Sequence, residues 1–341
     1  MPNTFFRRPR MLGLVTALTT GLMAMPAAAQ SLNDPVRSPR ANLSERVAPY
    51  APAMPVPAGM PFEGTAAAEP GAASIQTTGA RAPTGDAPLL EPHPDMPGMD
   101  RTGSEAARTI VGWDSRMRYH TQFYPNRALV LIAYQGFQWC TGFMVSPNTL
   151  VTSGHCVHSG GPWGNWYNID QFQVFPGRDG TNTPFGSCSV QTMWTVGGWV
   201  NHSRPHLDYG AMRLSCNIGS VTGWFGVYAP RDGALTDAPI RLIGYPGDRF
   251  QEQWGSSDMV RRLRPRLLCY RNDTVGGHSG SPVWNDRNNA RHPTGAYAFG
   301  VHGYGFHPTF PGLCGNPDAQ MNTAVRFRPR YVDNIIDWIN E

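Results

Sequence analysis

The 341-residue sequence contains no lysine, so all 28 of its basic side chains are arginines. Charged residues make up only 15% of the chain, and no run of arginines is interleaved with aromatic residues. The densest basic cluster, Arg261 to Arg266, fits a solvated loop equally well, and we expect no nucleic-acid partner. Beyond the first thirty residues no apolar run is long enough to span a bilayer, and we expect no membrane partner either.

The first 108 residues contain no tryptophan, no cysteine and few other aromatic residues. All ten tryptophans lie at or after Trp113, and all six cysteines lie at or after Cys140. Within residues 30–108 the aromatic residues are Tyr50 and Phe62, surrounded by alanine, proline and glycine. So little apolar surface cannot offset the entropy of ordering the chain. We interpret residues 30–108 as a mostly disordered pro-segment, with an extracellular linker or stalk as the alternative.

Residues 1–29 have the three parts of an export signal. Three arginines lie within the first ten residues, an apolar stretch runs from Met11 to Met25, and three alanines end the segment. The apolar stretch is too short and too rich in threonine for a membrane span. The pair Arg7-Arg8 would suit twin-arginine export, but the residues after it favour general secretion. We expect a soluble product, extracellular or periplasmic.

From Thr109 onward, short β-rich runs alternate with turn residues. Clear examples are residues 129–134, 142–145, 150–152, 172–175, 240–245 and 297–301. This pattern predicts an all-β sandwich or barrel. A helical period occurs at residues 331–340, where apolar residues fall at positions i, i+3, i+4 and i+7: Val332, Ile335, Ile336 and Ile339. We expect this helix to pack against a barrel.

The segment from Asp273 to Val283 carries the strongest chemical signal. Its centre, Gly-His-Ser-Gly at 277–280, places a hydroxyl between glycines that allow a tight turn. Such a turn can direct the N–H groups of Gly277 and Ser279 at one point, where an oxyanion would form if Ser279 attacked a carbonyl carbon. Because a serine hydroxyl is a weak nucleophile, this interpretation requires a base and a residue that orients the base.

His155 is the candidate base and Asp208 the candidate carboxylate. His155 lies in the sequence Thr-Ser-Gly-His-Cys, and Asp208 lies in an apolar, strand-like context. Read alone, His155 could be a packed histidine and Asp208 a turn residue. The order His155, Asp208, Ser279 is one of the few in which a catalytic triad occurs. Three other carboxylates compete with Asp208 in the same region: Asp170, Asp179 and Asp237.

These ordered motifs, with cysteines at 140 and 156 around the histidine, resemble those of the chymotrypsin-like serine proteases. The closest match is to the secreted bacterial glutamyl endopeptidases of the staphylococcal V8 type. Three further stretches resemble that branch: Ser-Gly-Ser-Pro at 279–282, Gly-Val-His at 300–302 and Asn-Thr-Ala-Val at 322–325. The resemblance covers the chain from Thr109 to its end.

The resemblance implies a trypsin-like protease domain over residues 109–341. It implies two six-stranded antiparallel barrels, about 109–218 and about 219–330, with the short helix at 331–340 after them. It assigns general-base, orienting and nucleophilic roles to His155, Asp208 and Ser279, with an oxyanion hole at Gly277 and Ser279. Protein or peptide substrates follow, and we expect a monomer that needs no cofactor.

Six cysteines in an exported chain predict three disulfides. The resemblance pairs Cys140 with Cys156, beside the candidate histidine. For the remaining four cysteines we expect Cys188–Cys216 and Cys269–Cys314, although the sequence leaves the other pairings open.

Substrate preference is predicted from the same resemblance. Thr274 and His302 match positions at which the V8 branch binds an acidic P1 side chain, and a hydroxyl and an imidazole suit a buried carboxylate. Asp273, six residues before Ser279, has the spacing at which the trypsin branch receives arginine or lysine. Because adjacent residues of an extended segment point in opposite directions, Asp273 and Thr274 should not both face the substrate. We favour glutamate at P1, aspartate second, over a basic or broad preference.

The residue before the candidate nucleophile is His278, where the trypsin branch has an aspartate that pairs with the freed N-terminus. The resemblance therefore implies that cleavage after Arg108 releases Thr109 as the mature N-terminus near the substrate site, with Ile110 as the alternative. Residues 109–341 carry more arginines than acidic residues, and such a mildly basic domain attracts acidic substrates weakly.

Two other classes of function compete with a protease. Zinc-like spacings occur at His155-Cys156-Val157-His158 and between His202 and His206, but the disulfide uses Cys156 and Pro205 would break the aligning helix. We therefore expect no catalytic metal, while a structural calcium site, which has no readable motif here, stays open. A catalytically silent, protease-like binding protein is the alternative of another class, and the intact triad argues against it.

Overall fold

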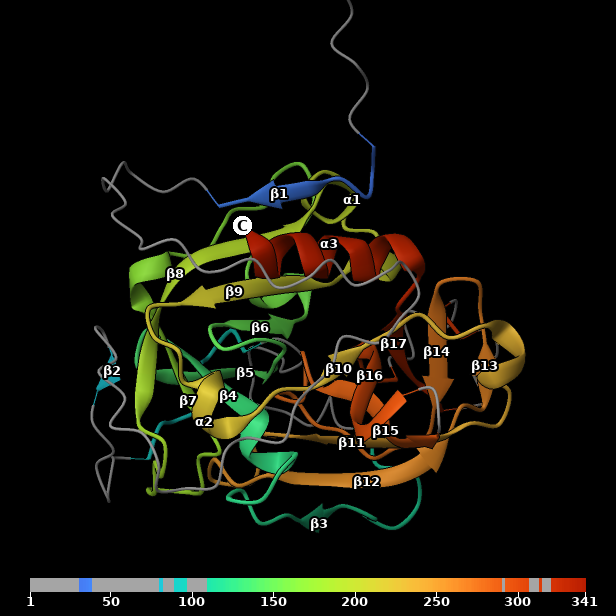
Figure 1. Ribbon diagram of the computed structural model, residues 1–341, viewed down its shortest axis with the longest axis horizontal. Coiled ribbons are helices and arrows are strands. Elements are labelled where there is room, and N and C mark those ends of the chain that lie inside the picture. Colours follow the sequence, from blue (N-terminus) through green and yellow to red (C-terminus); the bar gives the residue numbers. More distant parts are fainter. Residues whose placement is uncertain are drawn as a thin grey trace, which may run out of the picture. The chain divides into compact units, whose positions relative to one another are not determined.

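The computed structural model describes residues 31–38, 80–81, 89–96, 109–289, 292–306, 313–314 and 320–341. The predicted signal peptide, residues 1–29, and most of the predicted pro-segment lie outside these ranges. Two β-sheets make up the described part of the chain, and a C-terminal helix lies beside the strands of the first sheet (Figure 1). The all-β class predicted from the alternation of apolar runs and turns is confirmed.

The first sheet contains a closed six-stranded barrel. Its strands follow the order β8-β7-β4-β5-β6-β9, and β9 pairs again with β8 to close the ring. The strands are β4 (Leu129–Tyr134), β5 (Phe137–Met144), β6 (Thr149–Thr152), β7 (Phe172–Pro176), β8 (Ser187–Val196) and β9 (Gly210–Leu214). The ring of six strands is therefore continuous, and every residue of β4 is buried in this barrel.

The second sheet is curled but not closed. Among the described residues, no backbone pairing joins the strands at its two ends. Its order is β13-β14-β17-β16-β15-β11-β12-β3, with β10 beside β16. The strands are β3 (Met117–Arg118), β10 (Gly226–Val227), β11 (Pro239–Gly244), β12 (Trp254–Met259), β13 (Arg262–Leu263), β14 (Leu267–Tyr270), β15 (Pro282–Asn289), β16 (His292–Tyr304) and β17 (Asn322–Arg326).

Side chains bridge the gap between β12 and the segment that follows β14. Asn272 donates from Nδ2 to the Ser256 carbonyl at 2.6 Å, and Asp258 accepts from the Arg271 N–H at 2.7 Å. The second sheet is therefore a curled half-barrel, and side-chain hydrogen bonds bridge its open side where the sequence predicted a closed six-stranded barrel.

The barrel boundaries differ from the expected ones at the N-terminal end. The first barrel was expected over about 109–218, but its closed ring spans Leu129 to Leu214. The strand β3 pairs instead with β12 of the second sheet, through Met117 opposite Gly255. Residues 109–118 thus serve the second sheet, close to the segment that carries Ser279.

Helices are short except at the C-terminus. Helix α3 (Pro329–Asn340) confirms the predicted helix, and its Val332, Ile335 and Ile339 are buried. Trp338 stacks on Trp194 of β8. The remaining helical turns are α1 (Gly197–Val200), α2 (Gly219–Thr222), η2 (Asn126–Ala128), η3 (Gly154–Cys156), η4 (Ile169–Gln171), η5 (Pro205–Leu207) and η6 (Asp232–Ala234).

Parts of the predicted pro-segment lie against the barrels. Strand β1 (Pro35–Arg37) pairs antiparallel with β8, and β2 (Ala80–Arg81) pairs with the other end of β8. Residues 89–96 run beside the start of β5, where Gln138 donates to the Glu91 carbonyl. The interpretation of residues 30–108 as mostly disordered did not anticipate these contacts.

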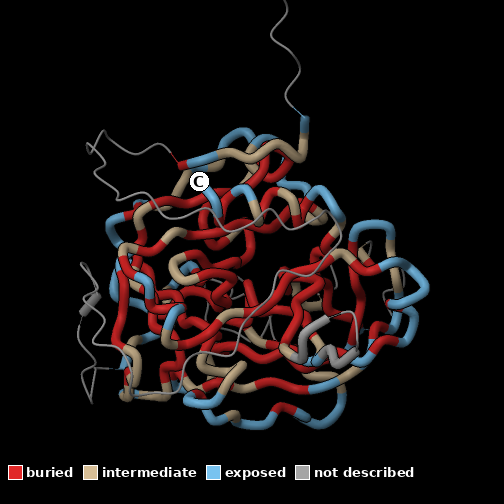
Figure 2. Tube along the Cα trace, in the orientation of Figure 1, coloured by how far each residue is buried: buried red, intermediate tan, exposed pale blue. Residues whose placement is uncertain are grey.

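Burial follows the strands of both sheets (Figure 2). Three disulfides join Cys140 to Cys156, Cys188 to Cys216 and Cys269 to Cys314. Within the described residues, no helix combines the length and the apolar character needed to cross a membrane.

Candidate active site

His155 and Asp208 form a directly bonded pair. His155 lies on η3, just after β6, and Asp208 ends η5, just before β9. The Nδ1 atom of His155 lies 2.6 Å from Oδ2 of Asp208, and the His155 backbone N–H donates to Oδ1 at 2.7 Å. Asp208 is fully buried. Two bonds to one residue fix the imidazole plane and direct its other nitrogen, Nε2, away from the carboxylate.

Gly154 makes this close approach possible. A Cβ atom at position 154 would lie 2.9 Å from Oδ1 of Asp208, closer than side chains normally pack. The glycine that precedes the histidine in the sequence motif is therefore explained by the space that the carboxylate needs.

Ser279 lies on a turn beside this pair. The turn is bounded by Gly277 and Gly280, which have φ angles of +96° and +89°, a region that favours glycine. The Ser279 carbonyl accepts from the Thr141 N–H at 2.8 Å and lies 3.9 Å from Sγ of Cys156. Cys156 follows His155 directly, so the backbone of Ser279 contacts the residue next to the histidine.

The hydroxyl of Ser279 is not hydrogen-bonded to His155. The Nε2 atom of His155 is buried and has no partner among the described residues. Catalytic hydrogen bonds are often long in the free enzyme and shorten when substrate binds. The hydrogen bond between His155 and Asp208 is thus formed, whereas the hydrogen bond between Nε2 of His155 and the Ser279 hydroxyl is not.

The backbone of the turn leaves two donors available. Among the described residues, no acceptor is found for the N–H groups of Gly277 and Ser279. The Gly277 carbonyl is held by the Thr141 hydroxyl at 2.7 Å, and the Gly280 N–H donates to the His302 carbonyl at 2.8 Å. Two N–H groups on one tight turn suit an oxygen that develops negative charge.

The predicted specificity residues lie around the same turn. Thr274 exchanges two backbone hydrogen bonds with Thr109, at 2.9 and 3.0 Å. Its hydroxyl is buried and has no partner among the described residues. A buried hydroxyl without a partner is costly, so a ligand group that bonds it would gain free energy.

His302 is buried and contacts Tyr270. The Tyr270 hydroxyl lies 2.6 Å from Nδ1 of His302. Burial, and then the neighbouring rings of His278 and His155, lower the pKa of His302 well below its usual value. Burial also raises the pKa of Tyr270, so its hydroxyl keeps its proton. When this hydroxyl donates to Nδ1, the proton of the neutral imidazole is on Nε2, which is then a donor.

Asp273 points away from this region. Its carboxylate accepts from the Val111 N–H at 2.8 Å and from the Ser115 N–H and hydroxyl at 2.7 and 2.6 Å. These three bonds hold residues 111–115, so the carboxylate is occupied by the chain itself.

Tyr304 is a neighbour of the pair that the sequence did not reveal. Its hydroxyl is hydrogen-bonded to Asp208, and burial together with that carboxylate raises the pKa of Tyr304 well above its usual value. A β-bulge between His302 and Tyr304 turns the ring toward the pair, 5.8 Å from the His155 ring. The pattern of alternating residues could not show this, because a bulge shifts the alternation.

Comparisons with known proteins agree with this geometry. A family model of the trypsin-like peptidase domain matches residues 140–290. A glutamyl endopeptidase of Bacillus licheniformis is 32% identical over 237 residues, which cover 68% of this chain and 70% of that protein. An extracellular metalloprotease of Bacillus subtilis is 30% identical over 240 residues, with 68% and 70% covered.

A solved structure of a Glu endopeptidase in complex with MPD shares the fold. It aligns with a TM-score of 0.57 at 24% identity and covers 68% of this chain and 100% of that one.

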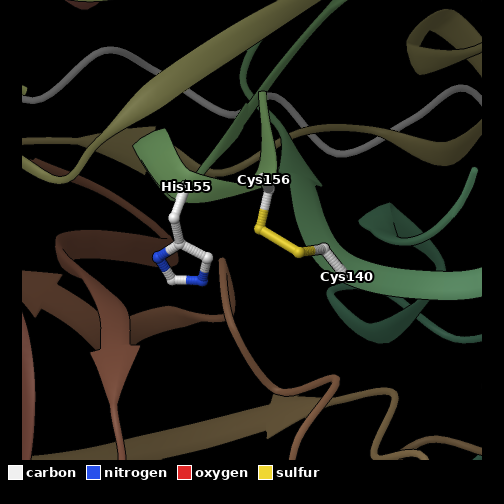
Figure 3. Close-up of side chains that lie close together, drawn as sticks. All are labelled: Cys140, His155 and Cys156. Carbon is white, nitrogen blue, oxygen red and sulfur yellow. A yellow bond between two sulfur atoms is a disulfide. The ribbon is translucent and has the colours of Figure 1, made fainter. Parts of the chain in front are cut away.

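The name of the Bacillus subtilis relative raises the question of a metal. Ligand atoms of Cys140, His155 and Cys156 lie within 4.8 Å of one another. The two sulfur atoms are joined in a disulfide beside the imidazole (Figure 3), so neither is a thiolate that could bind zinc. These residues do not fit a metal ion.

Proposed function

Because this chain belongs to the trypsin-like peptidase family and is a serine endopeptidase, we propose that it cleaves peptide bonds after glutamate, and second after aspartate, through an acyl-enzyme on Ser279. The observation that carries the proposal is the bonded pair His155–Asp208 with its unpartnered Nε2 atom, one residue from Cys156, whose Sγ lies 3.9 Å from the Ser279 carbonyl oxygen.

In the first half of the reaction, the Ser279 hydroxyl oxygen attacks the scissile carbonyl carbon while Nε2 of His155 takes the hydroxyl proton. The carbonyl oxygen becomes an oxyanion, which accepts hydrogen bonds from the N–H groups of Gly277 and Ser279. The imidazolium then gives its proton to the leaving amine as the peptide bond breaks. The acyl group remains on Ser279 as an ester.

In the second half, His155 takes a proton from water, and the resulting hydroxide attacks the ester. The same imidazolium returns the proton to the Ser279 oxygen, and the carboxylate product leaves. Asp208 accepts a hydrogen bond from the Nδ1–H of His155 throughout, which keeps Nε2 free as a base and stabilises the imidazolium.

Three donors support an acidic P1 side chain. The Thr274 hydroxyl has no partner among the described residues, and the neutral imidazole of His302 is a donor at Nε2 when the Tyr270 hydroxyl donates to its Nδ1. Cleavage before Thr109 would create an ammonium group at a residue already paired with Thr274. A carboxylate that leaves water needs such donors, and a charged donor strengthens the bond.

A basic P1 side chain is the alternative within the same chemistry, and it would need Asp273. The three hydrogen bonds of Asp273 to residues 111 and 115 argue against it.

A panel of fluorogenic peptides that differ only at P1 tests the proposal on the processed enzyme. We expect kcat/KM to be highest for glutamate, then aspartate, and far lower for glutamine, arginine and phenylalanine. Preference for arginine would move the specificity role to Asp273. Glutamine is the matched control, since it has nearly the shape of glutamate without the charge.

Ser279→Ala provides the chemical control. It should lower kcat by a factor on the order of 10⁵–10⁶ while the protein stays folded. Near-normal cleavage by this variant would reject Ser279 as the nucleophile, and no cleavage by the unaltered protein would favour the silent binding protein.

We also propose that the protein is exported and processed. Support comes from the signal-like pattern of residues 1–29 and from three disulfides, which persist in oxidising compartments. N-terminal sequencing of protein recovered from the culture medium should show a start at Thr109, and a start at Ile110 would support the alternative site. Retention of all activity inside the cell would contradict export.

A further inference from the structure

The turn that carries Ser279 is held in place at every carbonyl. The five carbonyls from Val275 to Ser279 accept, in order, from the His278 N–H, the Gly247 N–H, the Thr141 hydroxyl, the Ser281 N–H and the Thr141 N–H. Each carbonyl is therefore directed away from the point at which an oxyanion would form. A turn with one carbonyl reversed would lose a donor at that point and present an acceptor instead.

His278 provides the side-chain tie within this turn. The ring is fully buried. Its Nε2 atom lies 3.1 Å from the Trp254 carbonyl at the start of β12, and its Nδ1 atom lies 3.1 Å from the Val275 nitrogen. When Nε2 carries the proton it donates to Trp254, and Nδ1 accepts from the Val275 N–H. One neutral imidazole thus joins both ends of the turn to the neighbouring strand.

The surroundings of His278 favour this neutral form. Burial and then the Arg116 guanidinium lower the pKa of His278 to about 4. Asp248 acts in the opposite direction, but Arg116 pairs with it and with Asp114. The remaining titratable neighbour, His302, is itself kept neutral by burial.

Among the described residues, none of the hydrogen bonds that His278 makes involves residue 109. A buried carboxylate at this position would need a cation to compensate its charge, whereas a neutral imidazole needs only a donor and an acceptor. The donor and acceptor are backbone groups of Val275 and Trp254, and neither depends on a free N-terminus.

We propose that His278 is a positioning residue that holds the oxyanion hole in its active form before the chain is cleaved. The proposal rests on Ser279 as the nucleophile. Cleavage near Thr109 then completes the substrate site around Thr274, while the turn from Val275 to Ser279 is already assembled.

The first test compares uncleaved and processed protein with diisopropyl fluorophosphate, a small reagent that phosphorylates an activated serine with loss of fluoride. Full-length protein carrying Arg108→Gln serves as the uncleaved form. We expect its labelling rate at Ser279 to lie within 10-fold of that of processed enzyme. A rate 10³-fold slower would overturn the proposal. If processed enzyme is not labelled either, the assignment of Ser279 fails instead.

The second test replaces the ring. His278→Phe keeps most of the shape but removes both hydrogen bonds, and we expect kcat to fall by a factor on the order of 10²–10³ with KM nearly unchanged. His278→Asn offers an amide oxygen to the Val275 N–H and should recover at least a tenth of kcat. Unchanged kcat in a folded His278→Phe variant would overturn the proposal.

A matched control is His158, a second buried histidine, whose Nδ1 accepts from the Gly160 N–H at 2.9 Å. His158→Asn should leave the labelling rate and kcat within about 3-fold. An equal loss in His158→Asn and His278→Asn would assign both to general packing and overturn the positioning role.

If His278→Phe does not fold, ¹⁵N NMR of the histidines in the unaltered protein decides instead. A proton on Nε2 of His278 at pH 7 supports the proposal, and a proton on Nδ1 overturns it.

Discussion

Asp273 and Thr274 are neighbours in sequence, yet their side chains have unrelated partners. The carboxylate of Asp273 accepts three hydrogen bonds from residues 111 and 115, whereas the hydroxyl of Thr274 is buried without a partner among the described residues. The extended backbone between them explains the difference, since successive side chains point to opposite sides. Asp273 anchors residues 111–115, and we propose that the Thr274 hydroxyl bonds the P1 side chain.

Thr274→Val should lower kcat/KM for glutamate substrates by about 10- to 100-fold, because a hydrogen bond to a charged group contributes roughly 1.5–3 kcal/mol. Substrates with apolar P1 residues should change less than about 3-fold. The P1 peptide panel measures both. Asp273→Asn is the control: it should lower the melting temperature but preserve the order of P1 preference. A reversal of these two results would exchange the roles of the two residues.

Asp208→Asn should lower kcat by a factor on the order of 10⁴ at neutral pH, because the amide no longer fixes the tautomer in which Nε2 of His155 is a base. KM should change little, since Asp208 does not contact substrate. Steady-state kinetics on a peptide with glutamate at P1 measure the split. An equivalent loss in Asp170→Asn would show that a rival carboxylate has the orienting role.

Stability should decrease in acid because of the buried histidines. The pKa of His278 falls from 6.5 to about 4 on folding, so between these values the unfolded chain binds more protons than the folded one. The contribution of the neutral, buried His278 to the free energy of unfolding is complete above pH 6.5 and is lost as the pH falls toward 4. The largest possible loss is on the order of 3 kcal/mol.

Urea unfolding at pH 7 and pH 4.5 measures this loss, with Ser279→Ala as the background to prevent self-digestion. His278→Asn should flatten the dependence on pH. An unchanged slope in that variant would assign the acid sensitivity to other groups, of which His302 is the first to test because burial lowers its pKa too.

Asn33→Ala should destabilise the first barrel. The Asn33 side chain accepts from the buried Tyr209 hydroxyl at 2.9 Å, and its carbonyl accepts from Asn334 of α3 at 2.9 Å. Loss of the side-chain acceptor should cost about 1–3 kcal/mol. Thermal unfolding of the full chain measures the change, and Asn217→Ala, at an exposed position, is the control. Equal melting temperatures for both variants would show that Asn33 contributes nothing.

The sequence predicted the parts of the fold that depend on local patterns. The run Leu129 to Tyr134 forms β4 as expected, and the apolar period at 331–340 lies within α3. Likewise His155 and Asp208, found through their motifs, are bonded to each other. Local motifs and periodicity are enough for such features, because the residues that define them are close together in the chain.

Features that depend on distant partners escaped prediction. Strand β1 contains only Pro-Val-Arg, and it forms because Val36 meets Thr195, about 160 residues away in the sequence. The open side of the second sheet is bridged by Asn272 and the Ser256 carbonyl, which no strand pattern in the sequence indicates. Tyr304 reaches Asp208 through a bulge, which interrupts the alternation that sequence analysis uses.

The pairing of β1 with β8 has a practical consequence for making this enzyme. A gene trimmed to start at Thr109 would encode every candidate catalytic group but would leave the outer edge of β8 bare near Trp194 and Val196. Bare strand edges recruit other chains, and inclusion bodies are the usual result. Recombinant production should therefore retain the codons for residues 31–38, or supply that peptide in trans during refolding.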